Sequence, residues 1–226
     1  MTTHVVIAVD GPAASGKSST AQWVAERIGY RHVDSGSLYR AITAAMVRTN
    51  VPADTWTSAQ LLAHGPRIAL QAELHAFATL IDGQPVDDEI RGSAVTAHVS
   101  QVAQMSDVRD WVNAQVRLAA ESYDVVVDGR DIGTAVFPDA PLKIFLVADP
   151  WERARRRLTQ RLGRRPTDDE IAEETDAIVH RDARDATQTV QARDAVLVDT
   201  TNLTQTEQVE RIVALARAVS HRPLVT

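Results

Sequence analysis

The sequence has no cysteine and no long apolar run, and both absences narrow the classes of protein to which it can belong. Without cysteine there is neither a disulfide bridge nor a thiolate metal site. A membrane-spanning helix needs about 20 consecutive apolar residues, and every apolar stretch here is far shorter. The opening segment, MTTHVVIAVD, lacks the basic start of a signal peptide. We therefore expect a globular protein of the cytoplasm with no membrane partner.

Lysine is rare in the sequence, and the histidines show no pattern typical of a metal site. Of the 24 basic residues only Lys17 and Lys143 are lysines, and the seven histidines show no metal-ligand spacing such as HExxH. A bound metal would therefore be held by oxygen atoms. The arginine bias reflects either a GC-rich genome or the use of arginine to bind phosphate and carboxylate through paired hydrogen bonds. The net charge of −6 argues against a nucleic-acid partner.

What the sequence does contain is an alternation of strands and helices, interrupted once. Residues 50–92 break the rhythm with two short strands, over 67–74 and 78–86, and we interpret this antiparallel excursion as an insertion. The helix over 93–120 is expected to be interrupted near 106–107. Parallel strands joined by helical crossovers indicate an α/β fold. Buried strands are predicted at 4–9, 31–33, 123–127, 142–148 and 195–200, and helices at 17–29, 36–49, 93–120, 151–165, 168–185 and 204–220.

A complete phosphate-binding motif, GPAASGKSS, directly follows the first strand and opens a helix. The backbone amides of such a loop point at phosphate oxygens, and the helix dipole adds roughly half a positive charge there. Lys17 is expected to reach the β and γ phosphates of ATP, and the Ser18 hydroxyl to bind Mg²⁺. The alternative is a glycine-rich turn that merely connects strand to helix. The predicted nucleotide-binding residues are Gly11, Pro12, Ala13, Ala14, Ser15, Gly16, Lys17, Ser18 and Ser19.

A phosphate loop defines a nucleotide site but not a reaction. A regulatory GTPase would also need an NKxD guanine-binding motif and a DxxG switch, and neither string occurs. A kinase instead needs a second pocket that places an acceptor in line with the γ-phosphate. The segment VDSGSLYRA is the candidate, because we expect the second strand to lie beside the first and to end at the same crevice. Arg40 would clamp an acceptor phosphate there, unless it belongs to a solvated helix face.

Taken in order along the chain, these and further motifs resemble those of bacterial cytidylate kinases, which are P-loop nucleoside monophosphate kinases. The resemblance implies a P-loop NTPase three-layer α/β fold with a central five-stranded parallel sheet. It also implies a core of residues 1–40 and 93–226, a nucleoside-monophosphate-binding insertion near 41–92 and a short mobile lid near 153–168. The similarity covers nearly the whole chain and is carried by IAVDGPAASGKSS, DSGSLYR, DDEIRG, SQVAQMSDVR, VVVDGRDIGTAVFPDAPLKIFL, ERARRR, HRDARD and DAVLVDTTNLT.

The activity that this resemblance implies is phosphoryl transfer from ATP to CMP or dCMP, with Mg²⁺, by an enzyme that need be no more than a monomer. One position departs from the pattern. Gln188 stands where a further substrate-contacting arginine is expected, and glutamine carries no charge. The matching substrate residues are Ser35, Ser100, Arg109 and Asp131 for the cytosine, Arg40 and Arg130 for the acceptor phosphate, and Arg181 and Asp185 for the ribose.

The buried strand at 123–127 ends abruptly in the charged run DGRD. A strand end that presents two carboxylates around an arginine must face water, a metal or a charged ligand. Asp128 is the candidate carboxylate near Mg²⁺, directly or through water, as in other P-loop enzymes. Arg130 would then face the acceptor phosphate, and Asp131 the base or a neighbouring arginine. The alternative is a structural ion pair of Arg130 with either aspartate.

Seven arginines lie between positions 153 and 165, and an acidic helix follows. Most of them are expected to be solvated and paired with those acids. Arg153 and Arg157, chosen by helical spacing, are predicted to swing over the triphosphate and neutralise charge in the transition state. Together with Lys17 and Arg130 they form the predicted catalytic set. Closure of this segment would exclude water, which otherwise competes as phosphoryl acceptor.

Two other functions stay open on the sequence alone. One is a P-loop kinase for another small acceptor, such as UMP or a hydroxylated metabolite, and the block at 128–141 with Ser100 and Arg109 argues against it. The other is a nucleotide-binding regulatory protein, for which Gln188 is the only hint. ATP turnover that depends on CMP distinguishes a kinase from a regulator.

Overall fold

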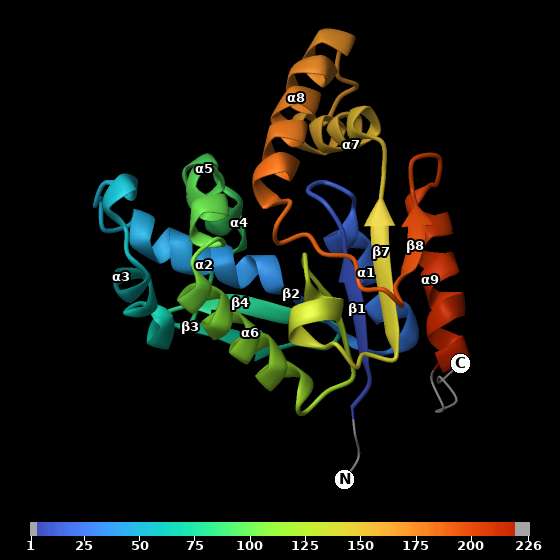
Figure 1. Cartoon of the computed structure of the whole chain (residues 1–226), viewed down its shortest axis with the longest axis horizontal. Coiled ribbons are helices and arrows are strands. Elements are labelled where there is room, and N and C mark those ends of the chain that lie inside the picture. The colour runs from blue at the N-terminus through green and yellow to red at the C-terminus, as the bar shows by residue number, and fades with distance from the viewer. Residues whose placement is uncertain (1–3, 220–226) are drawn as a thin grey trace.

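The computed structural model describes residues 4–219, and its core is a five-stranded parallel sheet (Figure 1). The strands lie in the order β2-β6-β1-β7-β8. Each neighbouring pair is parallel, which confirms the predicted fold class. The strand bounds are β1 (Val6–Asp10), β2 (Arg31–Asp34), β6 (Val125–Asp128), β7 (Leu142–Val147) and β8 (Val196–Asp199).

The second strand does not lie beside the first, so this part of the prediction is wrong. β6 is inserted between them and pairs with β1 on one side and with β2 on the other. The first crossover helix, α1 (Lys17–Ile28), carries the chain two strand positions away from β1, and β6 fills the gap only after the insertion. Strand order in a sheet therefore does not follow from chain order. As a result Asp34 and Asp128 end neighbouring strands in register.

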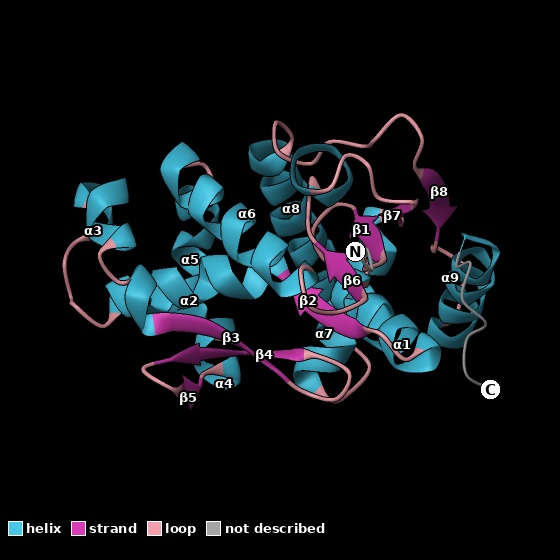
Figure 2. Ribbon diagram, turned by 90° about the horizontal axis from the view of Figure 1, so that it is seen from below, coloured by secondary structure: helices cyan, strands magenta, loops and turns pink. Residues whose placement is uncertain are grey.

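Helices cover both faces of the sheet and make a three-layer structure (Figure 2). The remaining long helices are α2 (Ser35–Val47), α5 (Ser93–Val102), α6 (Ser106–Ala120), α7 (Pro150–Leu162), α8 (Asp168–Asp185) and α9 (Gln205–Val219). Successive strand residues point to opposite faces. Val6 and Ala8 accordingly pack with α2 and α6, whereas Ile7 and Val9 pack with α1 and α9.

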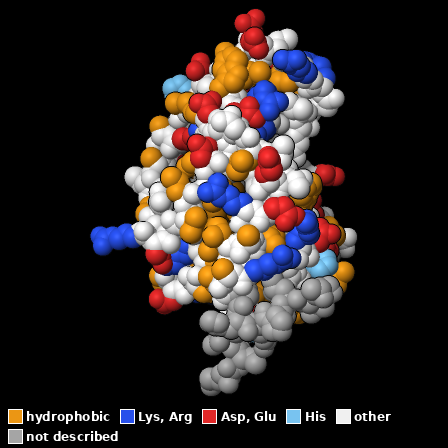
Figure 3. All heavy atoms as spheres, turned by 90° about the vertical axis from the view of Figure 1, so that its right-hand side faces the viewer, with side chains coloured by type: hydrophobic (Ala, Val, Ile, Leu, Met, Phe, Trp, Pro, Cys, Tyr) orange, Lys and Arg blue, Asp and Glu red, His pale blue; other side chains and the backbone are white. Residues whose placement is uncertain are grey.

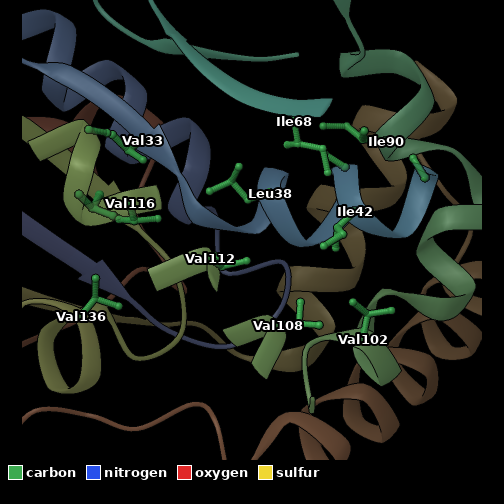
Figure 4. Close-up of a cluster of buried hydrophobic side chains, with 14 of the residues drawn as sticks. Val33, Leu38, Ile42, Ile68, Ile90, Val102, Val108, Val112, Val116 and Val136 are labelled. Carbon is green, nitrogen blue, oxygen red and sulfur yellow. The ribbon is translucent and has the colours of Figure 1, made fainter. Parts of the chain in front are cut away.

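The larger apolar core lies between α2 and α6 (Figure 4). Leu38 and Ile42 of α2 cluster with Val108, Val112 and Val116, which recur every four residues along α6. This spacing makes one apolar stripe on the helix. Burying each side chain of this size contributes about 1.5–3 kcal/mol. Both helices are therefore fixed firmly against the sheet.

Residues 50–92 form the predicted antiparallel excursion, with one strand more than expected. The strand predicted over 78–86 is divided because Asp82 and Gly83 both adopt positive φ and turn the chain. The turn between the first two strands of this insertion forms a hydrogen bond with the outer edge of β2 in the main sheet. Two short helices, α3 (Ser58–Leu62) and α4 (Asp87–Arg91), complete this segment. Its sheet has the order β3-β4-β5, with bounds Ile68–Ala72, Phe77–Ile81 and Gln84–Pro85.

The interruption predicted near 106–107 is confirmed, because α5 ends at Val102 and α6 begins at Ser106. The prediction for the last helix extends to Ser220, which lies outside the described residues, and α9 is described to Val219.

The arginine-rich helix is shorter than predicted. α7 ends at Leu162, because Gly163 takes a left-handed φ of 65°. α8 begins after Thr167, whose side chain caps the helix reciprocally with Glu170. The α7–α8 pair stands beyond the carboxyl ends of the strands (Figure 1). In open parallel sheets this edge is where ligands bind.

Two observations bear on macromolecular partners. Within residues 4–219 no helix is both long and apolar enough to cross a bilayer. On the face seen in Figure 3, basic, acidic and apolar side chains are interspersed. A surface that binds nucleic acid gathers positive charge on one side. This face does not have that charge distribution.

Candidate active site

β1 leads into the phosphate loop, and α1 begins where the loop ends. Gly11 has φ of 150°, and a Cβ atom there would lie 2.2 Å from the carbonyl oxygen of Leu146, so only glycine fits. Gly16 takes φ of 86° directly before α1. Lys17 curls back and donates from Nζ to the carbonyl of Pro12 at 2.7 Å. The loop thus forms a compact turn at a helix N-terminus, which suits phosphate oxygens.

The Lys17 ammonium group is buried within this turn. Burial, followed by the positive charge of Arg130, lowers the pKa of Lys17 to about 7. A cation with so little water needs an anionic partner to stay charged. A phosphate group in the loop would be such a partner.

The end of β6 places Asp128 beside the loop. Its Oδ2 accepts a hydrogen bond from the Ser18 hydroxyl at 2.7 Å, and its Oδ1 lies 2.6 Å from Nε2 of His32. Burial alone would raise the pKa of Asp128, but the hydrogen bond and charge of His32 hold it below its ordinary value. Burial likewise opposes charge on His32, and Asp128 raises the pKa of the imidazole nevertheless. The carboxylate is therefore ionised, with one oxygen next to Ser18.

Asp34 adds a second carboxylate at this edge, because β2 and β6 end in register. Burial and then the negative charge of Asp128 raise the pKa of Asp34. Its side chain accepts hydrogen bonds from the Ser37 amide at 3.2 Å and from Arg91 at 3.3 Å. The two adjacent carboxylates make an acidic edge beside the cationic loop.

A cavity of about 210 Å³ opens next to the phosphate loop, bordered by α2, α5, α6 and α8. Lys17 and Asp128 line it together with Gln188. Every residue that the sequence predicts to bind substrate also lines it, although these residues come from separate parts of the chain. They are Ser35, Arg40, Ser100, Arg109, Arg130, Asp131, Arg181 and Asp185.

Three arginines lie close enough together in this cavity for their positive charges to affect the pKa values of their neighbours. Burial, followed by Arg181, lowers the pKa of Arg40 to about 10. Burial, followed by Arg130, lowers the pKa of Arg181. Asp185 lies 3.1 Å from Arg130 and 3.5 Å from Arg181 and so serves both. An anionic ligand would relieve the remaining repulsion.

Arg130 pairs with Asp185 and with neither neighbouring aspartate, so the alternative expectation of a local ion pair is not what the structure contains. Its second nitrogen donates to the carbonyl of Gly11 at 3.0 Å. Asp131 forms its ion pair with Arg109 instead. Arg130 therefore links the phosphate loop to α8 across the cavity.

Comparison with known proteins agrees with this arrangement. A family model described as cytidylate kinase matches residues 7–218. A cytidylate kinase of Geobacillus kaustophilus is 42% identical over 220 residues, which cover 95% of this chain and 97% of that one. A cytidylate kinase of Limosilactobacillus reuteri is 40% identical, with coverage of 91% and 92%. This chain belongs to the cytidylate kinase family. The resemblance recognised in the sequence is thereby confirmed.

Among solved structures, a gluconokinase from Sinorhizobium meliloti shares the fold with this cytidylate kinase family member. The TM-score is 0.50 at 17% identity, with 96% of this chain and 94% of that chain covered. A likeness at this identity concerns the arrangement of the elements and not the substrate.

The two lid arginines predicted for this cytidylate kinase family member have different surroundings. Arg153 is buried and donates to the carbonyl of Ala13 at 2.9 Å and to Asp182 at 2.6 Å. Asp182 also accepts from the Ala13 amide at 3.2 Å, so this pair ties the phosphate loop to α7 and α8. Arg157 instead lines a larger cavity of about 1440 Å³ and lies 3.3 Å from Glu174.

Sequence reasoning missed four side chains at this site, namely Asp10, His32, Asp34 and Asp182. For Asp10 and Asp34 a signal existed, because each is an acid at the end of a buried strand, the same pattern that drew attention to Asp128. Asp182 lies in a quoted motif near the predicted Asp185. His32 had no signal beyond being a polar residue in a short strand.

Asp10 fastens the turn that follows β6. It accepts hydrogen bonds from the amides of Ile132 and Gly133, both at 2.8 Å. Burial nevertheless raises the pKa of Asp10 from 3.8 to about 6. A carboxyl whose folded-state pKa is raised contributes stability that is complete below the unfolded-state value and is lost as pH rises through the folded-state value.

We expect the free energy of unfolding of the wild type, relative to Asp10→Asn, to fall by about 2 kcal/mol between about pH 4 and pH 7. Urea titrations of both proteins at several pH values measure this difference. The asparagine also disturbs one backbone hydrogen bond, but that cost does not vary with pH. A constant difference would contradict the raised pKa.

Proposed function

We propose that this protein transfers the γ-phosphoryl group of ATP to CMP or dCMP and releases ADP with CDP or dCDP. The observation that carries the proposal is the cavity beside the phosphate loop, which combines an arginine cluster with a fixed donor and acceptor pair. Family membership supports the same reaction. In a cell this step would belong to pyrimidine nucleotide metabolism.

The arginine cluster suits the acceptor phosphate. Arg40, Arg130 and Arg181 line one cavity and carry more positive charge than Asp185 balances. Guanidinium groups bind phosphate through two parallel hydrogen bonds. A monophosphate held there lies next to the loop that binds the donor, which is the placement that in-line transfer requires. Its phosphate oxygens are already nucleophilic, so no general base is needed.

The base would be recognised at the other end of the cavity. Asp131 accepts and Arg109 donates, and their mutual ion pair fixes both groups side by side. Cytosine presents an amino donor next to a ring-nitrogen acceptor, whereas uracil presents a carbonyl acceptor next to an N–H donor. The pair therefore matches cytosine and opposes uracil. Ser35 and Ser100 add hydroxyl groups at the same cavity.

Asp128 and Ser18 fit a magnesium ion that arrives with the nucleotide. Their oxygen atoms are 2.7 Å apart beside the loop, and the carboxylate is ionised. Mg²⁺ prefers one or two carboxylates together with phosphate oxygens and water. Among residues 4–219 no group of three or more acidic or histidine side chains forms a site by itself. The bound ion would neutralise charge that develops on the transferring phosphoryl group.

The lid contributes in two ways under this proposal. Arg157 faces the larger cavity and would reach the triphosphate once Glu174 releases it. Arg153 would act on the phosphates through the loop that it holds in place. Closure of α7 and α8 over both nucleotides would exclude water.

The test compares ADP production with CMP, dCMP, UMP, AMP and no acceptor. CMP and dCMP are expected to exceed UMP in kcat/KM by about 10² or more. Asp131→Asn is expected to reduce that preference by about tenfold, because it removes a charged acceptor from the base. Asp139→Asn, a substitution of an exposed aspartate nearby, is the matched control and should behave as wild type.

The opposite outcomes are equally clear. A higher rate with UMP or AMP would assign the protein to another acceptor. ADP production that no acceptor changes would indicate a nucleotide-binding protein of another kind.

A further inference from the structure

His32 lies on β2 and directs its imidazole at the end of β6. Nε2 is 2.6 Å from Oδ1 of Asp128, and the two side chains are only 9% and 4% exposed. An ionised carboxylate can only accept, so Nε2 is the donor. A hydrogen bond to a charged group with so little surrounding water is strong and directional.

This bond determines how the carboxylate is turned. The terminal torsion of an aspartate is broad when nothing restrains it. Asp128 is restrained at both oxygens, by His32 at Oδ1 and by Ser18 at Oδ2. Loss of the first donor would leave Oδ1 buried and unsatisfied and would let the plane rotate. The direction of Oδ2 therefore depends on His32.

The backbone of residue 32 is fixed on both sides. Residue 32 is in register with Val126 of β6, and the His32 amide donates to the carbonyl of His75 at 2.9 Å. His32 also lines the larger cavity together with Lys17 and Ser18. His32 thus has a fixed backbone position, with the insertion on one side and the nucleotide cavity on the other.

We propose that His32 is a positioning residue, which orients Asp128 toward the metal ion of a bound metal–nucleotide complex. The inference rests on the proposed function, in which Asp128 and Ser18 hold Mg²⁺. Under this proposal His32 acts through Asp128 and is not itself a ligand of the metal. Hydrogen-bond partners of metal ligands commonly contribute about 10- to 100-fold to metal affinity.

Three substitutions separate this role from simple packing. His32→Gln puts an amide nitrogen close to the position of Nε2 and keeps a donor. His32→Asn carries the same amide on a side chain one carbon shorter, which does not reach Oδ1. His32→Leu fills the volume without any donor. Comparison of the glutamine and asparagine variants remains informative even if the leucine variant does not fold.

The measurement is the calorimetric Kd of AMP-PNP, an ATP analogue that does not transfer its phosphoryl group, with and without Mg²⁺ and without acceptor. By linkage, the ratio of the two Kd values is the factor by which the protein raises the nucleotide's affinity for the metal. Turnover with CMP is measured in parallel on the same preparations.

Wild type and His32→Gln are expected to show similar ratios. In His32→Asn and His32→Leu the ratio should fall by about tenfold, while the Kd without metal changes by less than about twofold. In an Asp128→Asn background, His32→Leu should have no further effect on the ratio, because the two residues act as one unit.

Equal ratios in all variants, or a wild-type ratio of one, would overturn the inference. So would equal losses in the glutamine and asparagine variants that track the loss of thermal stability, because packing alone would then explain them. A wild type that does not phosphorylate CMP contradicts the proposed function itself. A wild type that does so, with ratios insensitive to His32→Leu, contradicts only the role of His32.

Discussion

Replacing Arg130 with alanine is expected to lower kcat/KM for CMP by about 10³, with little change in the affinity for ATP. Arg130 donates to the carbonyl of Gly11 and pairs with Asp185, so it spans the space between the donor loop and the acceptor cavity. Its guanidinium group would contact the acceptor phosphate both before and during transfer. Alanine removes this charge and leaves Arg181 as the remaining partner of Asp185.

Steady-state rates at varied CMP and a direct binding measurement for AMP-PNP test this expectation. Arg130→Lys keeps the charge but not the paired donors, and it should fall between wild type and alanine. Arg184→Ala removes an exposed arginine of α8, the helix that carries the Asp185 partner of Arg130, and should leave the rates unchanged. A kcat/KM for Arg130→Ala close to that of wild type would show that the acceptor phosphate binds elsewhere.

The second large effect is expected at Lys17. Lys17→Met should lower kcat by roughly 10² to 10³, the loss typical for removal of one preorganised donor from a transition state. The ammonium group is buried near Arg130, which lowers the pKa of Lys17 to about 7, and a triphosphate would restore its full charge. Because burial disfavours the ammonium form of Lys17, and methionine fills similar space without a charge, the variant should be close to wild type in stability.

Single-turnover kinetics and thermal unfolding of the same protein separate the two effects. Lys143→Met is the matched control, since Lys143 is the other lysine of the chain and is also buried. Lys143 bonds to Asp194 and to the carbonyl of Pro138. Its loss should lower stability and leave the chemical step intact. The reverse pattern, with a rate defect only at Lys143, would contradict the assignment of Lys17.

The elements of this fold could be predicted because their signals are local. A phosphate motif between a buried strand and an amphipathic helix needs only a few neighbouring residues to be recognised. Strand order is different, because it depends on which segments pair across more than a hundred residues. The position of β6 between β1 and β2 had no local signal, so the pairing that places Asp34 beside Asp128 could not be predicted.

The members of the acceptor cavity could be named from the sequence, but their partners could not. Arg130 was expected to face the acceptor phosphate, with an ion pair to a flanking aspartate as the alternative, yet the carboxylate that it contacts comes from α8. Arg153 was expected over the triphosphate, and its side chain is instead buried against Ala13 and Asp182. Helical spacing identifies the side of a helix and not the atom that a long side chain reaches. Such pairings depend on the tertiary structure and cannot be read from local sequence.

The insertion of β6 between two earlier strands has a consequence for biosynthesis. Strands β1 and β2 leave the ribosome first, but they are not hydrogen-bonded to each other. The amide of Val5 donates to Asp124, a residue that is synthesised 119 positions later. A sheet closed by such distant segments folds late. The phosphate loop is therefore translated long before β6 can support it. Incomplete chains carry the motif without the site, and a nascent polypeptide is not expected to consume ATP.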